Sequence, residues 1–191
     1  MTVFKAGYLS EYQKFTDKTA QYPQGMVYVT LGLVGELGEL QSKMVSIEDP
    51  QDLTEEETIG LMHEAGDVFW YIARSCQELG LQFGLVFGHA MTGGFSPKRN
   101  EETGDVEFQG FGCKDAWSDV CALAEKTKKL VRDGRSIDHE VALTALISAA
   151  RIAAATCMKI DGNPMECIAA NMEKLSSRLE RGVIKGDGDN R

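Results

Sequence analysis

Residues 54–79 read TEEETIGLMHEAGDVFWYIARSCQEL, and this stretch indicates the structural class of the chain. Thr54 followed three residues later by Glu57 is a capping box, in which each side chain bonds the other residue's backbone N–H, so a helix is predicted to begin there. Apolar and small residues then recur every three or four positions, the period of one buried helical face. These residues are Leu61, Ala65, Val68, Ile72, Cys76 and Leu79. The stretch therefore predicts a long helix with one side in the core.

A second long helix is predicted just before this stretch, over residues 26–46. Its apolar positions follow helical steps of four, three and four. They are Leu33, Leu37, Leu40 and Met44. Gly32, Gly35 and Gly38 lie inside the same helix, and together they oppose it by roughly 2–3 kcal/mol relative to alanine. We expect these glycines to let another helix or a ligand approach the backbone closely.

Turn and capping residues predict four further helices and one long connection. The expected helices span residues 10–21, 114–132, 137–160 and 163–182. Ser10 and Gln13 fit a capping box for the first, while Asn163 and Pro164 are typical of a helix start for the last. Residues 88–112 are rich in glycine and predict a loop or linker, with a small hairpin at 105–108.

The composition is ordinary for a globular protein, with 43% hydrophobic and 26% charged residues. We expect one all-α domain over residues 1–191, with a catalytic half at 10–87, the linker 88–112, a second helical half at 113–182 and a flexible tail at 183–191. The formal charge of −9 argues against a nucleic-acid partner, which would need a basic surface. An acidic protein can still bind nucleotides where metal ions invert the local charge.

Cysteine usage and hydropathy indicate a cytoplasmic protein. The five cysteines form no C-x-x-C pair, so reduced thiols are expected. No signal peptide opens the chain, and no uncharged run approaches the ~18 residues of a membrane span. Arg151 interrupts the most apolar stretch, residues 141–158. We therefore expect no membrane partner.

Two carboxylate pairs carry the expected chemistry, Glu36 with Glu39 and Glu64 with Asp67. Each pair is spaced three residues apart, so both members project from one helical face. Two antiparallel helices would bring the pairs face to face, where four acidic groups require a positive partner. Mg²⁺ is the expected ion, with Mn²⁺ as a substitute, because Mg²⁺ is usually held by a few carboxylates plus substrate phosphates.

These motifs resemble a known family. Glu36-Leu-Gly-Glu39 followed by Glu64-Ala-Gly-Asp67-Val-Phe-Trp-Tyr is similar to the paired acidic motif of the MazG-like, all-α nucleoside triphosphate pyrophosphohydrolases. That superfamily includes dimeric dUTPases and phosphoribosyl-ATP pyrophosphohydrolase. Residues 11–14, 171–178 and 181–191 match as well. The resemblance covers residues 10–87 and 162–191, and it leaves the middle of the chain unaccounted for.

The resemblance implies a helical bundle that hydrolyses a (d)NTP to the (d)NMP and pyrophosphate, in house-cleaning or control of the nucleotide pool. The four acidic residues would hold Mg²⁺, and Glu36 would orient or deprotonate the attacking water. The expected substrate contacts are Lys43, Asn171, Lys174, Arg178, Lys185 and Arg191. Relatives assemble as dimers or tetramers, so a homodimer is expected.

Alternatives remain open for both function and origin. A non-catalytic helical interaction module would also carry acidic helix faces, and a phosphoribosyl-ATP pyrophosphohydrolase would share the motif. An offset of about 84–89 residues aligns 120–125 with 31–36 and 148–151 with 64–67, as a degenerate internal repeat would. The repeat would place Lys128 where Glu39 stands and Arg151 where Asp67 stands. The other interpretation is an inserted helical hairpin of unrelated origin.

Overall fold

The computed structural model describes residues 5–23, 25–45, 47, 52–92, 96–99, 106–109 and 113–185, with side chains left undescribed at 96–99, 106–109 and 113–115. Within these ranges the chain forms seven helices and one two-stranded hairpin, so the expected all-α class is confirmed. The elements are α1 (Tyr8–Thr19), α2 (Met26–Val45), α3 (Glu55–Leu79), α4 (Phe83–Thr92), β1 (Ser96–Arg99), β2 (Val106–Gln109), α5 (Cys113–Asp133), α6 (His139–Lys159) and α7 (Pro164–Glu180).

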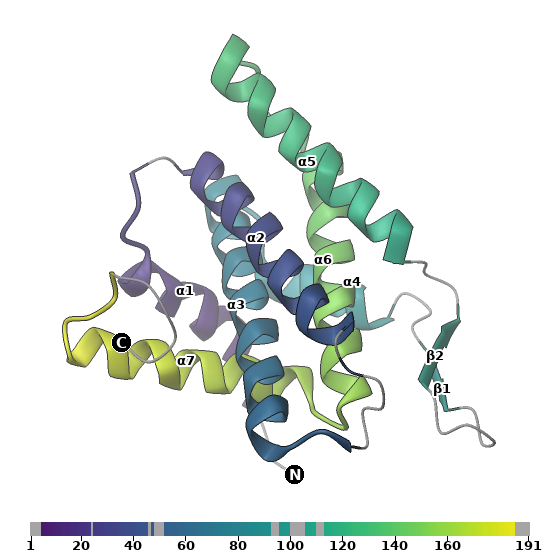
Figure 1. Ribbon diagram of the computed structural model, residues 1–191. Coiled ribbons are helices and arrows are strands. Elements are labelled where there is room, and N and C mark those ends of the chain that lie inside the picture. The colour runs from purple at the N-terminus through teal and green to yellow at the C-terminus, as the bar shows by residue number, and fades with distance from the viewer. Residues whose placement is uncertain are drawn as a thin grey trace.

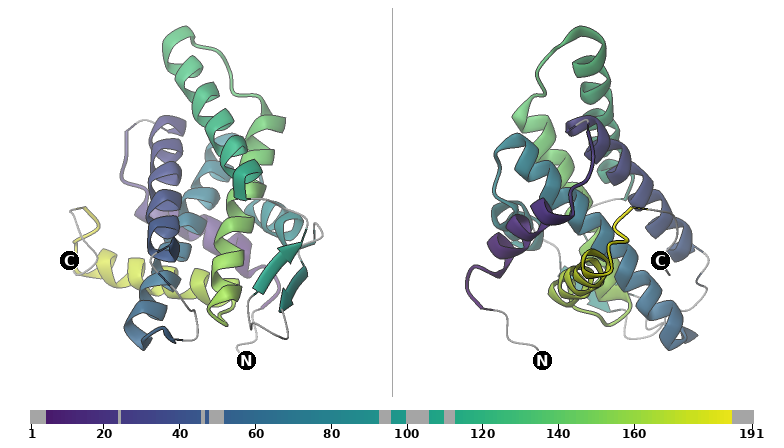
Figure 2. Two further views of the ribbon diagram at one scale, coloured as in Figure 1. Left: turned by 45° about the vertical axis from the view of Figure 1, so that its right-hand side comes forward. Right: turned by 90° about the vertical axis from the view of Figure 1, so that its left-hand side faces the viewer.

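Helix α3 runs through the middle of the molecule, and α1, α2, α4, α6 and α7 all contact it (Figure 1). Helices α2 and α3 form one hairpin, α5 and α6 form a second, and α7 crosses α3 and also contacts α1 (Figure 2). The core lies where the two hairpins meet. Its fully buried side chains include Leu33, Leu37, Phe69, Leu123 and Leu146. Whether the second hairpin arose by duplication stays a prediction.

The predicted start of α3 is confirmed in detail. The Thr54 backbone N–H donates to Glu57 Oε2 at 2.9 Å, and the Glu57 N–H donates to Thr54 Oγ1 at 3.2 Å, which completes the capping box. The helix ends at Gly80, whose φ of 68° is the left-handed conformation that glycine adopts without strain. The predicted stripe from Leu61 to Cys76 is buried. A long, well-capped α3 can therefore position acidic side chains firmly.

The first helix begins earlier than the sequence indicated. Gly7, with φ 90°, precedes α1, so Ser10 lies inside the helix and the expected capping box with Gln13 is wrong. Tyr8 and Leu9 pack against the core, and this packing extends the helix by two residues. Gln13 instead bonds the α3–α4 connection: its side chain donates to the Leu81 carbonyl and accepts from the Phe83 N–H, both at 2.9 Å.

Helix α4 was not predicted, and it continues to Thr92, so the expected loop begins later than Gly88. Phe83 and Ala90 are fully buried, which explains why this short segment is helical despite its glycines. Strands β1 and β2 pair antiparallel, and β2 nearly coincides with the predicted hairpin segment 105–108. The bounds of α2, α5, α6 and α7 differ from those expected by no more than two residues.

Helix α6 has the length and the hydropathy of a membrane-spanning helix, although the sequence predicted no membrane span. Among the described helices it is long and apolar enough to cross a membrane by length and composition alone. However, 56% of that window is buried inside the protein, against neighbours that include α3 and α5. The core helix of a globular protein passes the same test, so the finding is weak evidence for a membrane span.

The glycines of α2 differ in their surroundings. A Cβ at Gly32 would lie 2.1 Å from Cε1 of the Tyr71 ring, so the expected close approach is confirmed there. At Gly35 and Gly38, apart from the neighbouring residues and the nearby backbone of α2 itself, no atom of the described chain lies within 4 Å of such a Cβ. These two positions therefore have no packing partner within the described protein.

This difference predicts opposite effects for two alanine substitutions in the same helix. Gly32→Ala is expected to destabilise the protein by about 1–3 kcal/mol, because Tyr71 must move. The matched change Gly35→Ala is expected to stabilise it by up to about 1 kcal/mol through helix propensity. Urea unfolding monitored by circular dichroism measures both changes. Equal effects of the same sign would contradict the packing at Gly32.

Candidate metal centre

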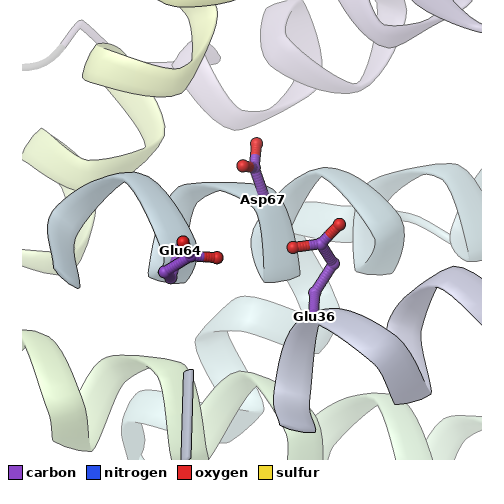
Figure 3. A group of neighbouring side chains, drawn as sticks. All are labelled: Glu36, Glu64 and Asp67. Atoms are coloured by element: carbon purple, nitrogen blue, oxygen red, sulfur yellow. The ribbon is translucent and has the colours of Figure 1, made fainter. Parts of the chain in front are cut away.

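Three carboxylates meet where α2 and α3 face each other. Glu36 projects from α2, while Glu64 and Asp67 project from successive turns of α3 (Figure 3). One oxygen of each carboxylate lies within 4.8 Å of the other two. The spacing of three residues in α3 places both of its acids on one helical face, where both come within reach of Glu36 on α2. The structure thus brings together three of the four acidic residues identified in the sequence.

Glu39 lies beside this cluster but outside its mutual distances. It is exposed on α2, one turn beyond Glu36. Its negative charge still acts on Glu36, because it contributes to raising the pKa of that carboxyl group. Glu39 therefore borders the cluster, and it would need a change of side-chain conformation to supply a fourth oxygen.

Two lysines contact the carboxylates from different helices. Lys43, in the last turn of α2, forms an ion pair with Glu64. Lys174, from α7, lies 2.6 Å from Asp67 Oδ2 through its Nζ atom. The Lys174 side chain is 10% exposed and that of Lys43 is 45% exposed. Two of the three lysines expected to contact substrate, Lys43 and Lys174, therefore border the acidic cluster, whose carboxylates are drawn in Figure 3.

A buried hydrogen-bond chain fixes Asp67. The Tyr12 hydroxyl donates to Asn171 Oδ1 at 2.7 Å, and Asn171 Nδ2 donates to Asp67 Oδ1 at 2.7 Å. Tyr12 and Asn171 are both fully buried. Gly66 permits this arrangement, since a Cβ there would lie 2.8 Å from Asn171 Cβ. Asn171 thus orients Asp67 in this structure, and Tyr12 supports Asn171 as a positioning residue, a role that the sequence patterns did not assign to it.

The remaining predicted substrate contacts are spread along α7 and the tail. Arg178 lies on α7 and is 5% exposed, so it is held within the protein. Lys185 is exposed shortly after the end of α7. Arg191 lies outside the described residues. Lys174, among the cations expected on the closing segment, pairs with a carboxylate of the cluster.

A second polar cluster joins α1 to α3. Arg74 forms ion pairs with Asp17 and with Glu78, the latter at 3.0 Å between Nη2 and Oε1, and Nε of Arg74 donates to the Tyr22 hydroxyl at 2.8 Å. The Tyr22 ring stacks on Tyr28 with centroids 4.5 Å apart. Because Arg74 is buried and each of its guanidinium nitrogens makes one of these contacts, it serves the packing of the helices.

Burial and neighbouring negative charges shift the pKa of Glu36 strongly. Loss of solvent, followed by the charges of Asp67, Glu39 and Glu64, raises the pKa of Glu36 to about 8, and Lys174 only partly opposes them. Glu36 therefore holds a proton at neutral pH when no metal ion is bound. The donor set consists entirely of carboxylate oxygens, which suits a hard divalent ion such as Mg²⁺ or Mn²⁺. The residues present thus fit the expected metal.

Comparison with known proteins gives one informative match. The chain is 38% identical over 85 residues to the Gene 37 protein of Mycobacterium phage L5, a match that covers 39% of this chain and 75% of that protein. The relative's name states no activity. No protein-family model matches the chain, and no solved structure matches it significantly.

Proposed function

We propose a function for this chain, which belongs to the family of the Gene 37 protein of Mycobacterium phage L5: Mg²⁺-dependent hydrolysis of a nucleoside triphosphate to the monophosphate and pyrophosphate. The observation that carries this proposal is the cluster of Glu36, Glu64 and Asp67 within 4.8 Å of one another. Lys43 and Lys174 add ammonium groups at its edge, which suits a polyanionic substrate. The resemblance of the acidic motifs to MazG-like enzymes supports the same reaction.

The three clustered carboxylates would hold the metal, with Glu39 able to join them. Bound Mg²⁺ would neutralise charge on the triphosphate and lower the pKa of a water. We assign Glu36 to that water, because it faces Glu64 and Asp67 from another helix. A positioned carboxylate can act as the general base that takes a proton from the attacking water. Glu36 would accept the proton as the water attacks the α-phosphorus, and pyrophosphate would leave.

The lysines would have two successive roles. Without substrate, Lys43 and Lys174 offset the charge of Glu64 and Asp67. Their flexible stems would let the ammonium groups move to phosphate oxygens when a nucleotide binds. Asp67 would keep its place during this change, because Asn171 and Tyr12 hold it through buried hydrogen bonds.

A nucleotide panel tests the proposal directly. The purified protein is incubated with Mg²⁺ and each common NTP and dNTP, with phosphoribosyl-ATP as a further substrate, and pyrophosphate is separated from orthophosphate. We expect pyrophosphate as the primary product. Orthophosphate as the primary product would contradict the mechanism.

A thermal melt with Mg²⁺ and each nucleotide distinguishes the non-catalytic alternative. A ligand that binds only the folded state raises its stability by about 2.7 kcal/mol at 100 times its dissociation constant. We expect such a shift with at least one nucleotide. No shift and no hydrolysis across the panel would favour a helical interaction module.

Lys174→Met is predicted to weaken substrate binding more than catalysis. Methionine keeps the apolar stem but loses the ammonium group, so KM should rise about tenfold or more, as expected for a lost charge-assisted hydrogen bond. The Mg²⁺ affinity of the substrate-free protein should increase, because a competing cation next to Asp67 is removed. Steady-state kinetics and calorimetry measure the two effects.

The matched control for this change is Lys128→Met. Lys128 is an exposed lysine on α5 that pairs with Glu125, remote from the carboxylate cluster in sequence and on another helix. The Lys128→Met substitution should leave KM and Mg²⁺ affinity unchanged. An unaltered KM in Lys174→Met would remove Lys174 from the substrate site.

We also propose the homodimer and the cytoplasmic setting expected from the sequence. Leu31 and Val45 are 68% and 79% exposed on α2, and a second copy that covered this helix would bury both of them. Light scattering coupled to size exclusion measures the mass in solution. A monomer at micromolar concentration would contradict the dimer.

A further inference from the structure

Two buried thiols meet at the corner between α6 and α7. Cys157 lies in the last turn of α6, Cys167 lies in the first turns of α7, and both side chains are fully buried. Their Sγ atoms are 2.9 Å apart. This separation is shorter than the about 3.5–4.0 Å at which even two carbon atoms pack. The fold thus presses together two groups that can form a covalent bond.

The turn between the helices holds the two cysteines at this corner. The Gly162 N–H donates to the Cys157 carbonyl at 2.8 Å, and Asp161 takes a left-handed φ of 54°. Asn163 then caps α7 by accepting from the Met165 N–H at 2.9 Å. The chain therefore reverses within a few residues, and the two thiols face each other through local structure.

We propose that Cys157 and Cys167 form an intrachain disulfide that fastens α7 to α6. This proposal is independent of the proposed reaction, and it revises for this pair the expectation that all thiols stay reduced. The oxidant is a low-molecular-weight disulfide, RSSR. One cysteine thiolate attacks RSSR and releases RS⁻, and the second thiolate then attacks the mixed disulfide and releases another RS⁻. The two protons lost by the cysteines are taken up by the two RS⁻ groups, so RSSR is reduced to two RSH.

The burial of the pair determines how the bond would form. Contact with the Cys167 thiol, together with burial, raises the pKa of Cys157 above its ordinary value. The thiolate is therefore scarce while the corner stays closed, and the exchange requires brief opening of the turn. Once formed, the bond is shielded from solvent and should resist reduction more than an exposed disulfide.

The bond would act on the helix that holds Asp67. The Cys167 carbonyl oxygen lies 2.9 Å from the position of a Cβ at Gly66, the residue before Asp67. One turn after Cys167, Asn171 donates to Asp67. Fastening the start of α7 therefore fixes the part of this helix that rests on the acidic segment of α3.

The test uses the full chain, first reduced and then equilibrated with glutathione disulfide. We expect the intact mass to fall by two hydrogens and peptide mapping to find a 157–167 cross-link. Thiols titrated in denaturant should number two fewer than the five of the sequence. The oxidised protein should melt about 5–10 °C above the reduced one. Retention of all five thiols, a cross-link between other cysteines, or an unchanged melting temperature would overturn the proposal.

Variants separate this pair from the other thiols. Cys157→Ala should abolish both the cross-link and the oxidation-dependent rise in melting temperature, and Cys167→Ala should do the same. The matched control is Cys121→Ser, because Cys121 is an exposed cysteine on α5. The Cys121→Ser variant should still form the 157–167 cross-link and should still melt at a higher temperature after oxidation. Should the alanine variants fold poorly, peptide mapping of the wild-type protein still decides whether the 157–167 bond forms.

Discussion

Glu36→Gln is expected to lower the rate of pyrophosphate release by about 10²–10⁴-fold, the usual contribution of a general base. Glutamine has the size of protonated Glu36 and preserves its packing, but it can neither accept the water's proton nor supply a negative oxygen to the cluster. The loss should appear in kcat/KM for the best substrate of the nucleotide panel, measured with saturating Mg²⁺. Circular dichroism and a thermal melt establish that the variant is folded.

The matched control is Glu125→Gln. Glu125 is the residue that the proposed repeat aligns with Glu36, yet it is exposed on α5 and pairs with Lys128 and Lys129. This change should leave the rate within about twofold of the wild type, as is usual for surface positions away from the site. Equal losses in the two glutamine variants would mean that net charge matters and that Glu36 has no specific role.

Asp67→Asn provides a second variant in the cluster. Asp67 accepts from Asn171 and pairs with Lys174, so asparagine would lose the negative charge offered to the metal and would also disturb the contact with α7. We expect an activity loss at least as large as that of Glu36→Gln. A variant that kept near-wild-type pyrophosphate release would remove Asp67 from the site.

The sequence predicted those parts of the fold that short segments determine. The capping box of Thr54 and Glu57 and the Asn163–Pro164 start of α7 depend on residues within one turn, so spacing alone identifies them. The predicted start of α1 was wrong because Tyr8 packs against the core, so the helix begins two residues before the predicted capping residue Ser10. Helix α4 was missed because burial, which local patterns do not specify, stabilises a short glycine-containing segment.

In the candidate site too, local spacing predicts some features, whereas others depend on residues far apart in the sequence. The spacing of Glu64 and Asp67 determines that they share a face, and pairing of consecutive helices brings Glu36 to them. Glu39 follows the same spacing, yet it is exposed, because a helix turn displaces each residue around the axis as well as along it. The bond between Tyr12 and Asn171 joins residues 159 positions apart, and no local pattern can predict such a partner.

In the metal-free protein, Glu36→Gln is also expected to change how stability depends on pH. The pKa of Glu36 rises from its ordinary value of 4.5 to about 8 in the fold. Between these values the folded protein holds a proton that the unfolded chain has lost, so stability falls as pH rises. The contribution of Glu36 is fully present below about pH 4.5 and is lost as pH passes about 8. The glutamine variant cannot ionise and should not show this decline.

At about pH 9 the metal-free variant should therefore be more stable than the wild type, by on the order of 2 kcal/mol after allowance for partial solvent exposure. The melting temperature should differ by roughly 4–8 °C, and the difference should disappear near pH 4.5. Thermal melts in excess chelator across this pH range measure it. Glu125→Gln, which removes an exposed carboxylate, should follow the wild-type curve.

With Mg²⁺ present, the wild type should instead be more stable than Glu36→Gln, because the metal binds the ionised carboxylates that protons otherwise neutralise. Binding at about pH 7 requires Glu36 to release its proton, so Mg²⁺ affinity should rise with pH until about pH 8 and then level off. Calorimetry in buffers of different ionisation enthalpy should detect close to one proton released per metal ion. In Glu36→Gln both the proton release and most of the Mg²⁺-induced stabilisation should vanish. A Mg²⁺ affinity in the wild type that is constant between about pH 6 and 9 would mean that Glu36 does not ligate the ion, even though the fold places it against Glu64 and Asp67.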